Sequence, residues 1–139
     1  MKKHAAVTLL ILALVALPGL VNAQSRHTIK ADVPFEYVAN GKTMPAGECT
    51  IELRGDSQNI LWISVGDQHL FAVPNSTESL KPSDQTKLVF NVYGDRYFLS
   101  EISREGESRG YELPMSKLEK ELRAQNVTKT SVTLVASVQ

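Results

Sequence analysis

The stretch that decides the fold class is Glu48-Cys49-Thr50-Ile51-Glu52-Leu53-Arg54, in which polar and apolar side chains alternate at every position. Successive side chains of a β-strand point to opposite faces of the sheet, so Cys49, Ile51 and Leu53 would share one face. A helix would instead need apolar side chains three and four positions apart. The stretch therefore predicts a half-buried strand.

The same alternation continues on both sides of this segment. It runs through residues 28–37, 61–65, 69–73, 88–92, 97–102 and 132–138. Asn40-Gly41 and Gly66-Asp67 predict tight hairpin turns, because these residues tolerate positive φ. Pro34 cannot donate a ladder hydrogen bond, so we expect the first strand to lie at an edge or to bulge there. The polar segment 75–85 predicts an exposed loop.

Short alternating strands joined by tight turns pair in antiparallel fashion, and their apolar faces must meet. The sequence therefore predicts a mostly β fold, an antiparallel β-sandwich or small β-barrel of about seven strands with one short helix in the C-terminal half. The sandwich is favoured over the barrel. Ser116 and Glu119 form the capping box of that helix, and Leu118 and Leu122 would face the sheet.

The first 23 residues have the pattern of a cleavable signal peptide. Lys2 and Lys3 precede an apolar run from Ala5 to Leu17, and that run is shorter than the roughly 20 residues needed to cross a bilayer. Val21 and Ala23 suit the −3 and −1 positions of a cleavage site before Gln24. We therefore expect one β domain over residues 24–139, secreted or periplasmic, with no stable membrane span after cleavage.

Charge and cysteine content narrow the classes of function. The full chain carries 15 basic and 15 acidic residues, and it contains one cysteine. A balanced charge argues against nucleic acid as a partner. A single cysteine cannot form an intramolecular disulfide, so the core must stabilise the domain. The partner is expected to be an unidentified protein or small molecule.

Reactive residues do not form a recognisable catalytic or metal-binding pattern. His27 and His69 lack neighbouring ligands at zinc-site spacing, and no cofactor is predicted. Cys49 falls on an inward strand position without a base, so it is interpreted as a small buried hydrophobe. Residues 106–110 match Gly-x-Ser-x-Gly, but no histidine follows Ser108 in the sequence. The paired acids Glu48 and Glu52, and Glu101 and Glu105, fall on solvent faces. We therefore expect a protein that is not an enzyme.

Four aromatic residues do not occupy the alternating strand positions that carry the inward-facing apolar side chains, so they are expected to point outward. They are the candidate ligand or partner surface: Trp62, Phe71, Tyr93 and Tyr97, with Tyr111 as a further member. Outward aromatics can stack on a ligand or seat a partner. Tyr93 and Tyr97 would share a face if the intervening turn, Gly94-Asp95-Arg96, has three residues. The favoured alternative is that the helix over residues 116–125 covers this face.

Six segments occur together in a recognisable order: Val33-Pro34-Phe35, Gly41-Lys42, Pro45-Ala46-Gly47-Glu48, Lys87-Leu88-Val89-Phe90, Tyr93-Gly94-Asp95-Arg96-Tyr97-Phe98-Leu99 and Glu112-Leu113-Pro114. Over most of residues 30–125 the chain resembles a family of small exported bacterial β proteins with no assigned activity. In that pattern an aromatic residue is expected where this chain has Cys49. The resemblance implies export and a single domain, and it brings no catalytic residues.

Three hypotheses for the function follow. The first is a non-catalytic binding or structural module of the periplasm or cell exterior. The second is a carrier of a small apolar ligand, for which Ala31, Cys49 and Ala136 would leave interior room. The third is a hydrolase, which would require Arg96, Glu101 and His69 to gather in one cleft.

Overall fold

The computed structural model describes residues 28–56 and 59–139, which form twelve strands and one α-helix. The strands are β1 (Thr28–Val33), β2 (Tyr37–Ala39), β3 (Lys42–Met44), β4 (Gly47–Arg54), β5 (Ile60–Val65), β6 (Gln68–Ala72), β7 (Asn75–Glu78), β8 (Lys87–Tyr93), β9 (Arg96–Ser103), β10 (Arg109–Glu112), β11 (Lys129–Val135) and β12 (Ser137–Val138). The helix, α2, spans Lys117–Ala124. The predicted signal peptide and His27 lie outside the described residues.

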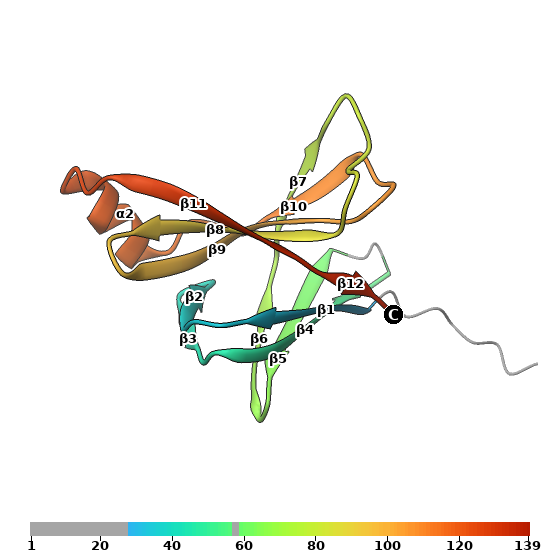
Figure 1. Ribbon diagram of the computed structural model, residues 1–139, viewed down its shortest axis with the longest axis horizontal. Coiled ribbons are helices and arrows are strands. Elements are labelled where there is room, and N and C mark those ends of the chain that lie inside the picture. The colour runs from blue at the N-terminus through green and yellow to red at the C-terminus, as the bar shows by residue number, and fades with distance from the viewer. Residues whose placement is uncertain (1–27, 57–58) are drawn as a thin grey trace, which may run out of the picture.

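The strands form two sheets that face each other, as Figure 1 shows for β8 and β9 above β1 and β4. Sheet A has the order β12-β1-β4-β5-β6, and sheet B has the order β11-β8-β9-β10-β7 with β2 and β3 beside β9. Every strand pairing is antiparallel except that of β2 with β9. The predicted mostly β, sandwich-like fold is confirmed, and the alternative of a closed barrel is wrong.

One hydrophobic core fills the space between the sheets. Ile51 and Ile63 enter it from sheet A, and Leu88 and Phe90 enter it from sheet B. These are the inward positions that the period-two alternation predicts. Leu134 is half-buried and packs against the same core. Burial of facing apolar sides is therefore what holds the two sheets together.

The chain passes between the sheets four times, after β1, β3, β6 and β11. β1 ends at Val33 in sheet A and β2 begins at Tyr37 in sheet B. The prediction of one strand through Tyr37 is therefore wrong, because Pro34 has no N–H to continue the ladder. At the last crossing, at Ala136, β11 in sheet B is followed by β12 in sheet A. The four crossings connect the two sheets.

Segment 75–85 is not wholly a loop. Residues Asn75–Glu78 form β7, which pairs with β10 at the edge of sheet B. β7 is short and polar, and it pairs with β10 through backbone groups without an apolar face of its own. A pattern based on hydrophobic alternation cannot detect such strands. This is one reason that twelve strands are found where about seven were predicted.

The turn between β8 and β9 has two residues, since Tyr93 pairs with Arg96 across Gly94 and Asp95. The three-residue loop was therefore wrong. Tyr97 pairs with Val92, so Tyr93 and Tyr97 lie on opposite faces of sheet B.

The helix begins at the predicted N-cap, because the Ser116 side chain accepts a hydrogen bond from the Glu119 amide. The Glu119 side chain, which a capping box would turn back to the Ser116 amide, bonds to sheet B instead. Its buried face differs from the expectation. Glu119 is buried, whereas Leu118 and Leu122 are only half-buried. The Glu119 carboxylate accepts hydrogen bonds from the Asn91 amide and the Tyr93 hydroxyl, so α2 lies over the outer face of β8.

Candidate functional site

The outer face of sheet A carries a cluster of apolar and aromatic side chains on β5, on β6 and on the residue that follows β6. We call this the aromatic patch, and its members are Ile60, Trp62, His69, Phe71 and Val73. Trp62 lies directly opposite Phe71 across the two strands, and His69 lies opposite Ser64. The intervening residues Leu61, Leu70 and Ala72 are buried in the core. Strand alternation therefore forces the patch outward.

The patch is built around the Trp62 ring. The His69 ring stacks on it with centroids 4.6 Å apart, and the Phe71 ring lies 4.1 Å away at 59°. From β4, on the other side of β5, the Arg54 guanidinium carbon sits 4.4 Å from the Trp62 centroid. Arg54 is held in turn by Glu52 at 2.8 Å. Side chains from both neighbouring strands, β4 and β6, therefore contact the Trp62 indole.

The outer members of the patch remain open to solvent. Phe71 is 55% exposed and Val73 is 63% exposed. An apolar group of this kind on a sheet face is a feature of interaction surfaces.

The edge of β6 beside the patch is closed by side chains from the β2–β3 hairpin. The Asn40 amide donates to the Phe71 carbonyl at 3.0 Å, and the Lys42 ammonium donates to the His69 carbonyl at 2.9 Å. These bonds occupy acceptors that an added strand would need. The patch is therefore open to a partner from its face rather than from its edge.

Tyr93 does not belong to an outer surface. It is 2% exposed, and its ring meets the edge of Phe98 with centroids 5.7 Å apart. Burial raises the pKa of its hydroxyl, and the neighbouring Glu119 carboxylate acts in the same direction. Coverage by the helix, the favoured alternative from the sequence, is thus found at Tyr93. Tyr111 is also buried, as part of the core.

Tyr97 lies at one end of the sandwich, on the opposite sheet from Trp62 and Phe71. Its ring stacks on Phe35 with centroids 3.8 Å apart, and Phe35 also meets the edge of Phe90. The four aromatic residues predicted as one surface therefore occupy three separate places, and only Trp62 and Phe71 are neighbours.

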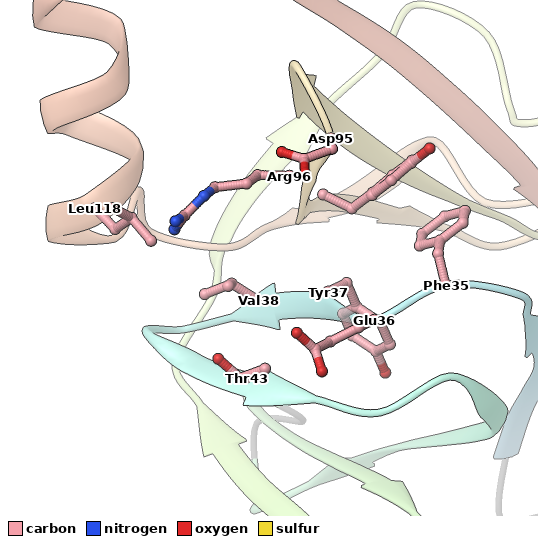
Figure 2. Close-up of a pocket in the computed structure, with 9 residues that line it drawn as sticks. Phe35, Glu36, Tyr37, Val38, Thr43, Asp95, Arg96 and Leu118 are labelled. Carbon is pink, nitrogen blue, oxygen red and sulfur yellow. The ribbon is translucent and has the colours of Figure 1, made fainter.

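A pocket of about 450 Å³ opens beside Phe35 and Tyr97 (Figure 2). Figure 2 shows the Arg96 side chain reaching toward Leu118 of α2 and Val38 of β2. Glu36, Asp95 and Thr43 complete the lining with Tyr37. The charged side chains here are solvent-exposed. The pocket is a mixed surface hollow between the β2–β3 hairpin, the β8–β9 turn and the helix.

The groups required for the hydrolase hypothesis are not brought together. Arg96 lines the pocket of Figure 2, Glu101 lines a different hollow on sheet B, and His69 belongs to the aromatic patch. Glu48 and Glu52 lie on the outer face of sheet A beside Lys30 and Arg54. Among the described residues, no group of three or more His, Cys, Asp or Glu side chains could hold a metal ion.

Ser108 of the Gly-x-Ser-x-Gly match lies in the polar connection between β9 and β10, and the element that follows it directly is a strand rather than a helix. Its carbonyl accepts a hydrogen bond from the Ser79 amide. The connection therefore lacks the strand-to-helix setting that this motif has in hydrolases.

Cys49 is buried as predicted, but it has a partner that the sequence did not indicate. The Tyr37 hydroxyl donates a hydrogen bond to its sulfur at 3.2 Å. Burial raises the pKa of the Cys49 thiol and raises the pKa of Tyr37 far above its ordinary value. Cys49 also pairs with Ala31 across β1 and β4, so the Tyr37 ring occupies the interior space next to these small residues.

Sequence reasoning identified Trp62 and Phe71 but missed Ile60, His69, Val73 and Arg54 as members of the same site. The sequence did contain a signal for the apolar members. Residues 60 and 62 alternate with the inward residues Leu61 and Ile63, so they must face the other side of the strand. The capping of β6 by Asn40 and Lys42 had no such signal, since it depends on how the hairpin lies against a strand far along the chain.

The chain matches no protein-family model, no curated protein and no solved structure. In the part of the chain that the structure describes, no helix has the length and apolar character to span a membrane.

Proposed function

We propose that this protein is a non-catalytic binding module of the periplasm or cell exterior, and that the aromatic patch is the face that contacts a protein partner. The observation that carries the proposal is the exposure of Phe71 and Val73 beside a firmly packed Trp62. Protein interfaces are enriched in aromatic residues and arginine, and their strongest contacts come from rigid aromatic anchors.

The geometry favours a protein over a ligand that stacks on a free ring face, such as a sugar. Stacking needs an open aromatic face, but Trp62 is contacted by Arg54 from β4 and by His69 and Phe71 from β6. What the patch offers instead is the outer surface of Phe71 and Val73. An apolar pocket or side chain of another protein is the complement of such a surface.

Support for export comes from the sequence alone. The basic start, the short apolar run and the Val21-x-Ala23 ending have the order that a cleavable leader requires. In such an exported protein the hydrophobic core has to stabilise the domain without a disulfide, because the one cysteine is a buried free thiol. The carrier and hydrolase hypotheses find less support, because Tyr37 fills the space beside Cys49 and the reactive groups lie apart.

The test compares three tagged full-length proteins produced in the native cell: the wild type, Phe71→Ser and Leu80→Ser. Leu80 is a matched control, because it is a fully exposed apolar residue in a loop away from the patch. We expect one envelope protein to co-purify with the wild type and Leu80→Ser, and its apparent affinity for Phe71→Ser to fall by about 30-fold, the scale of a strong interface residue. Equal recovery with all three proteins would refute the proposal.

A further inference from the structure

The strands at the margins of the two sheets differ in how well their free edges are protected. In the described part of the chain these strands are β3, β6, β7, β11 and β12. β3 has three residues, β7 has four and β12 has two, so each offers little backbone to an incoming strand. β6 is longer, but Asn40 and Lys42 occupy its carbonyl groups. Short or capped edges are the usual defence against unwanted strand pairing.

β11 has none of these defences. It has seven residues, contains neither proline nor glycine, and carries a single charge at Lys129. It pairs with β8 on one side, and Figure 1 shows it along the outer margin of its sheet. Among residues 28–56 and 59–139 no strand pairs with its other side, so alternate N–H and C=O groups there have no strand partner.

The side chains of β11 are also incompletely covered. Val132 and Leu134 face inward but are only half-buried, and Val135 on the outer face is 66% exposed. Their partners on β8, Phe90 and Leu88, are fully buried. A strand added beyond β11 would cover the exposed sides of these residues.

We propose that β11 pairs with β11 of a second copy of this chain in antiparallel orientation, forming a two-fold symmetric dimer with a continuous sheet. Charge selects this orientation. A parallel pair would place the two Lys129 ammonium groups side by side, whereas an antiparallel pair separates them by about the length of the strand, roughly 20 Å. That separation exceeds the screening length of about 8 Å at physiological salt.

The small area of the contact sets its strength. One seven-residue strand pair buries less than the roughly 800 Å² per partner of a standard stable interface. The dimer is therefore weak, with a dissociation constant on the order of 100 μM. This inference concerns a different part of the molecule from the aromatic patch, so either can fail without the other.

The experiment measures sedimentation of residues 24–139, the chain expected after leader cleavage, over a concentration series up to about 1 mM, well above the dissociation constant expected for so small a contact. The variants are Ser131→Lys with Thr133→Lys, and Ser131→Glu with Thr133→Glu. Ser131 and Thr133 are both exposed on the outer face of β11, so the fold tolerates charged side chains at these two positions. We expect the wild type to dimerise, each charged variant to dimerise at least tenfold more weakly, and an equimolar mixture of the two variants to recover the dimer.

Restoration in the mixture separates strand pairing from damage to the fold, because opposite charges then face each other across the joined strands. A wild type that stays monomeric throughout the series would overturn the inference. So would a dimer that both charged variants leave unchanged, or one that Phe71→Ser abolishes while they do not, since the contact would then lie elsewhere.

Discussion

At the scale of single residues, Glu119 is the polar group on which the helix depends. It is buried, and one of its carboxylate oxygens accepts hydrogen bonds from both Asn91 and Tyr93. Its backbone amide meanwhile donates to the Ser116 side chain at the helix start. The residue that the capping box predicts for the first turn is thus also the anchor of the helix on sheet B. The sequence does not indicate the second role, because burial of a charged side chain depends on partners from a distant strand.

Replacing this anchor should separate the effect of hydrogen bonding from that of charge. We expect Glu119→Ala to lower the free energy of unfolding by about 2 kcal/mol, since it leaves two donors unsatisfied. Glu119→Gln keeps an acceptor oxygen and should cost less than half as much. Urea unfolding at pH 7 measures both. Equal losses would mean that the carboxylate charge, rather than its acceptor oxygen, stabilises the helix.

At the same scale, Cys49 makes the free energy of unfolding depend on pH in the alkaline range. Burial raises the pKa of the thiol, so the folded chain keeps its proton at pH values where the unfolded chain releases it. The unfolded chain then binds fewer protons, and stability falls as pH rises above the ordinary thiol pKa of about 8.5.

Between pH 7.5 and 9.5 the wild type should therefore lose about 1 kcal/mol of unfolding free energy that Cys49→Ala does not lose. The comparison uses the change with pH in each protein, so the packing cost of the substitution cancels. Tyrosines Tyr37 and Tyr93 contribute in the same direction at higher pH, because burial also raises their pKa values. An identical pH dependence in both proteins would argue against a raised thiol pKa.

At the scale of elements, the β2–β3 hairpin combines a predictable turn with an unpredictable contact. Asn40 and Gly41 both have positive φ, at 47° and 80°, as the sequence pair predicts. The same Asn40 side chain reaches the Phe71 carbonyl and closes the edge of β6. The turn is encoded locally, whereas the contact requires the fold that brings residues 40 and 71 together.

Two substitutions at this position distinguish the two roles. Asn40→Gly retains the turn and loses only the hydrogen bond, whereas Asn40→Ala also places an alanine in the left-handed region. We expect Asn40→Ala to lower the unfolding free energy by about 1–2 kcal/mol and Asn40→Gly by less. Thermal unfolding monitored by circular dichroism provides the comparison. If the two variants lose the same amount, the hydrogen bond to β6 that both lack accounts for the loss, and the left-handed turn does not.

Elements with an apolar face were predictable, and elements without one were not. β4, the β5–β6 hairpin and the core positions of β8 follow the alternation directly. β7 is built from Asn75, Ser76, Thr77 and Glu78, so no hydrophobic pattern marks it. β1 and β2 share one unbroken alternation across Pro34, yet they belong to different sheets. The alternation of apolar and polar residues therefore predicts which side chains face the core, but it does not predict where the chain passes from one sheet to the other.

At the scale of the whole molecule, the aromatic residues lie in different places: in the core, under the helix, and on the outer face of sheet A. Those that face inward, such as Tyr37 and Phe90, fill the core, and Tyr93 is covered by the helix. Trp62 and Phe71 are left on the outer face of sheet A. The sequence identified this pair as outward, and the structure adds His69, Arg54 and Val73 as the side chains that turn two aromatics into a surface.

The central claim is that this surface contacts a protein partner, and site-specific photocrosslinking tests it most directly. p-Benzoylphenylalanine is placed at Val73, in the patch, or at Lys30, on β1 at the far side of the same sheet face, and the cells that produce each protein are irradiated. We predict a crosslink to one protein of the envelope from position 73 and none from position 30. Absence of a crosslinked product at position 73, or the same product from both positions, would contradict the account.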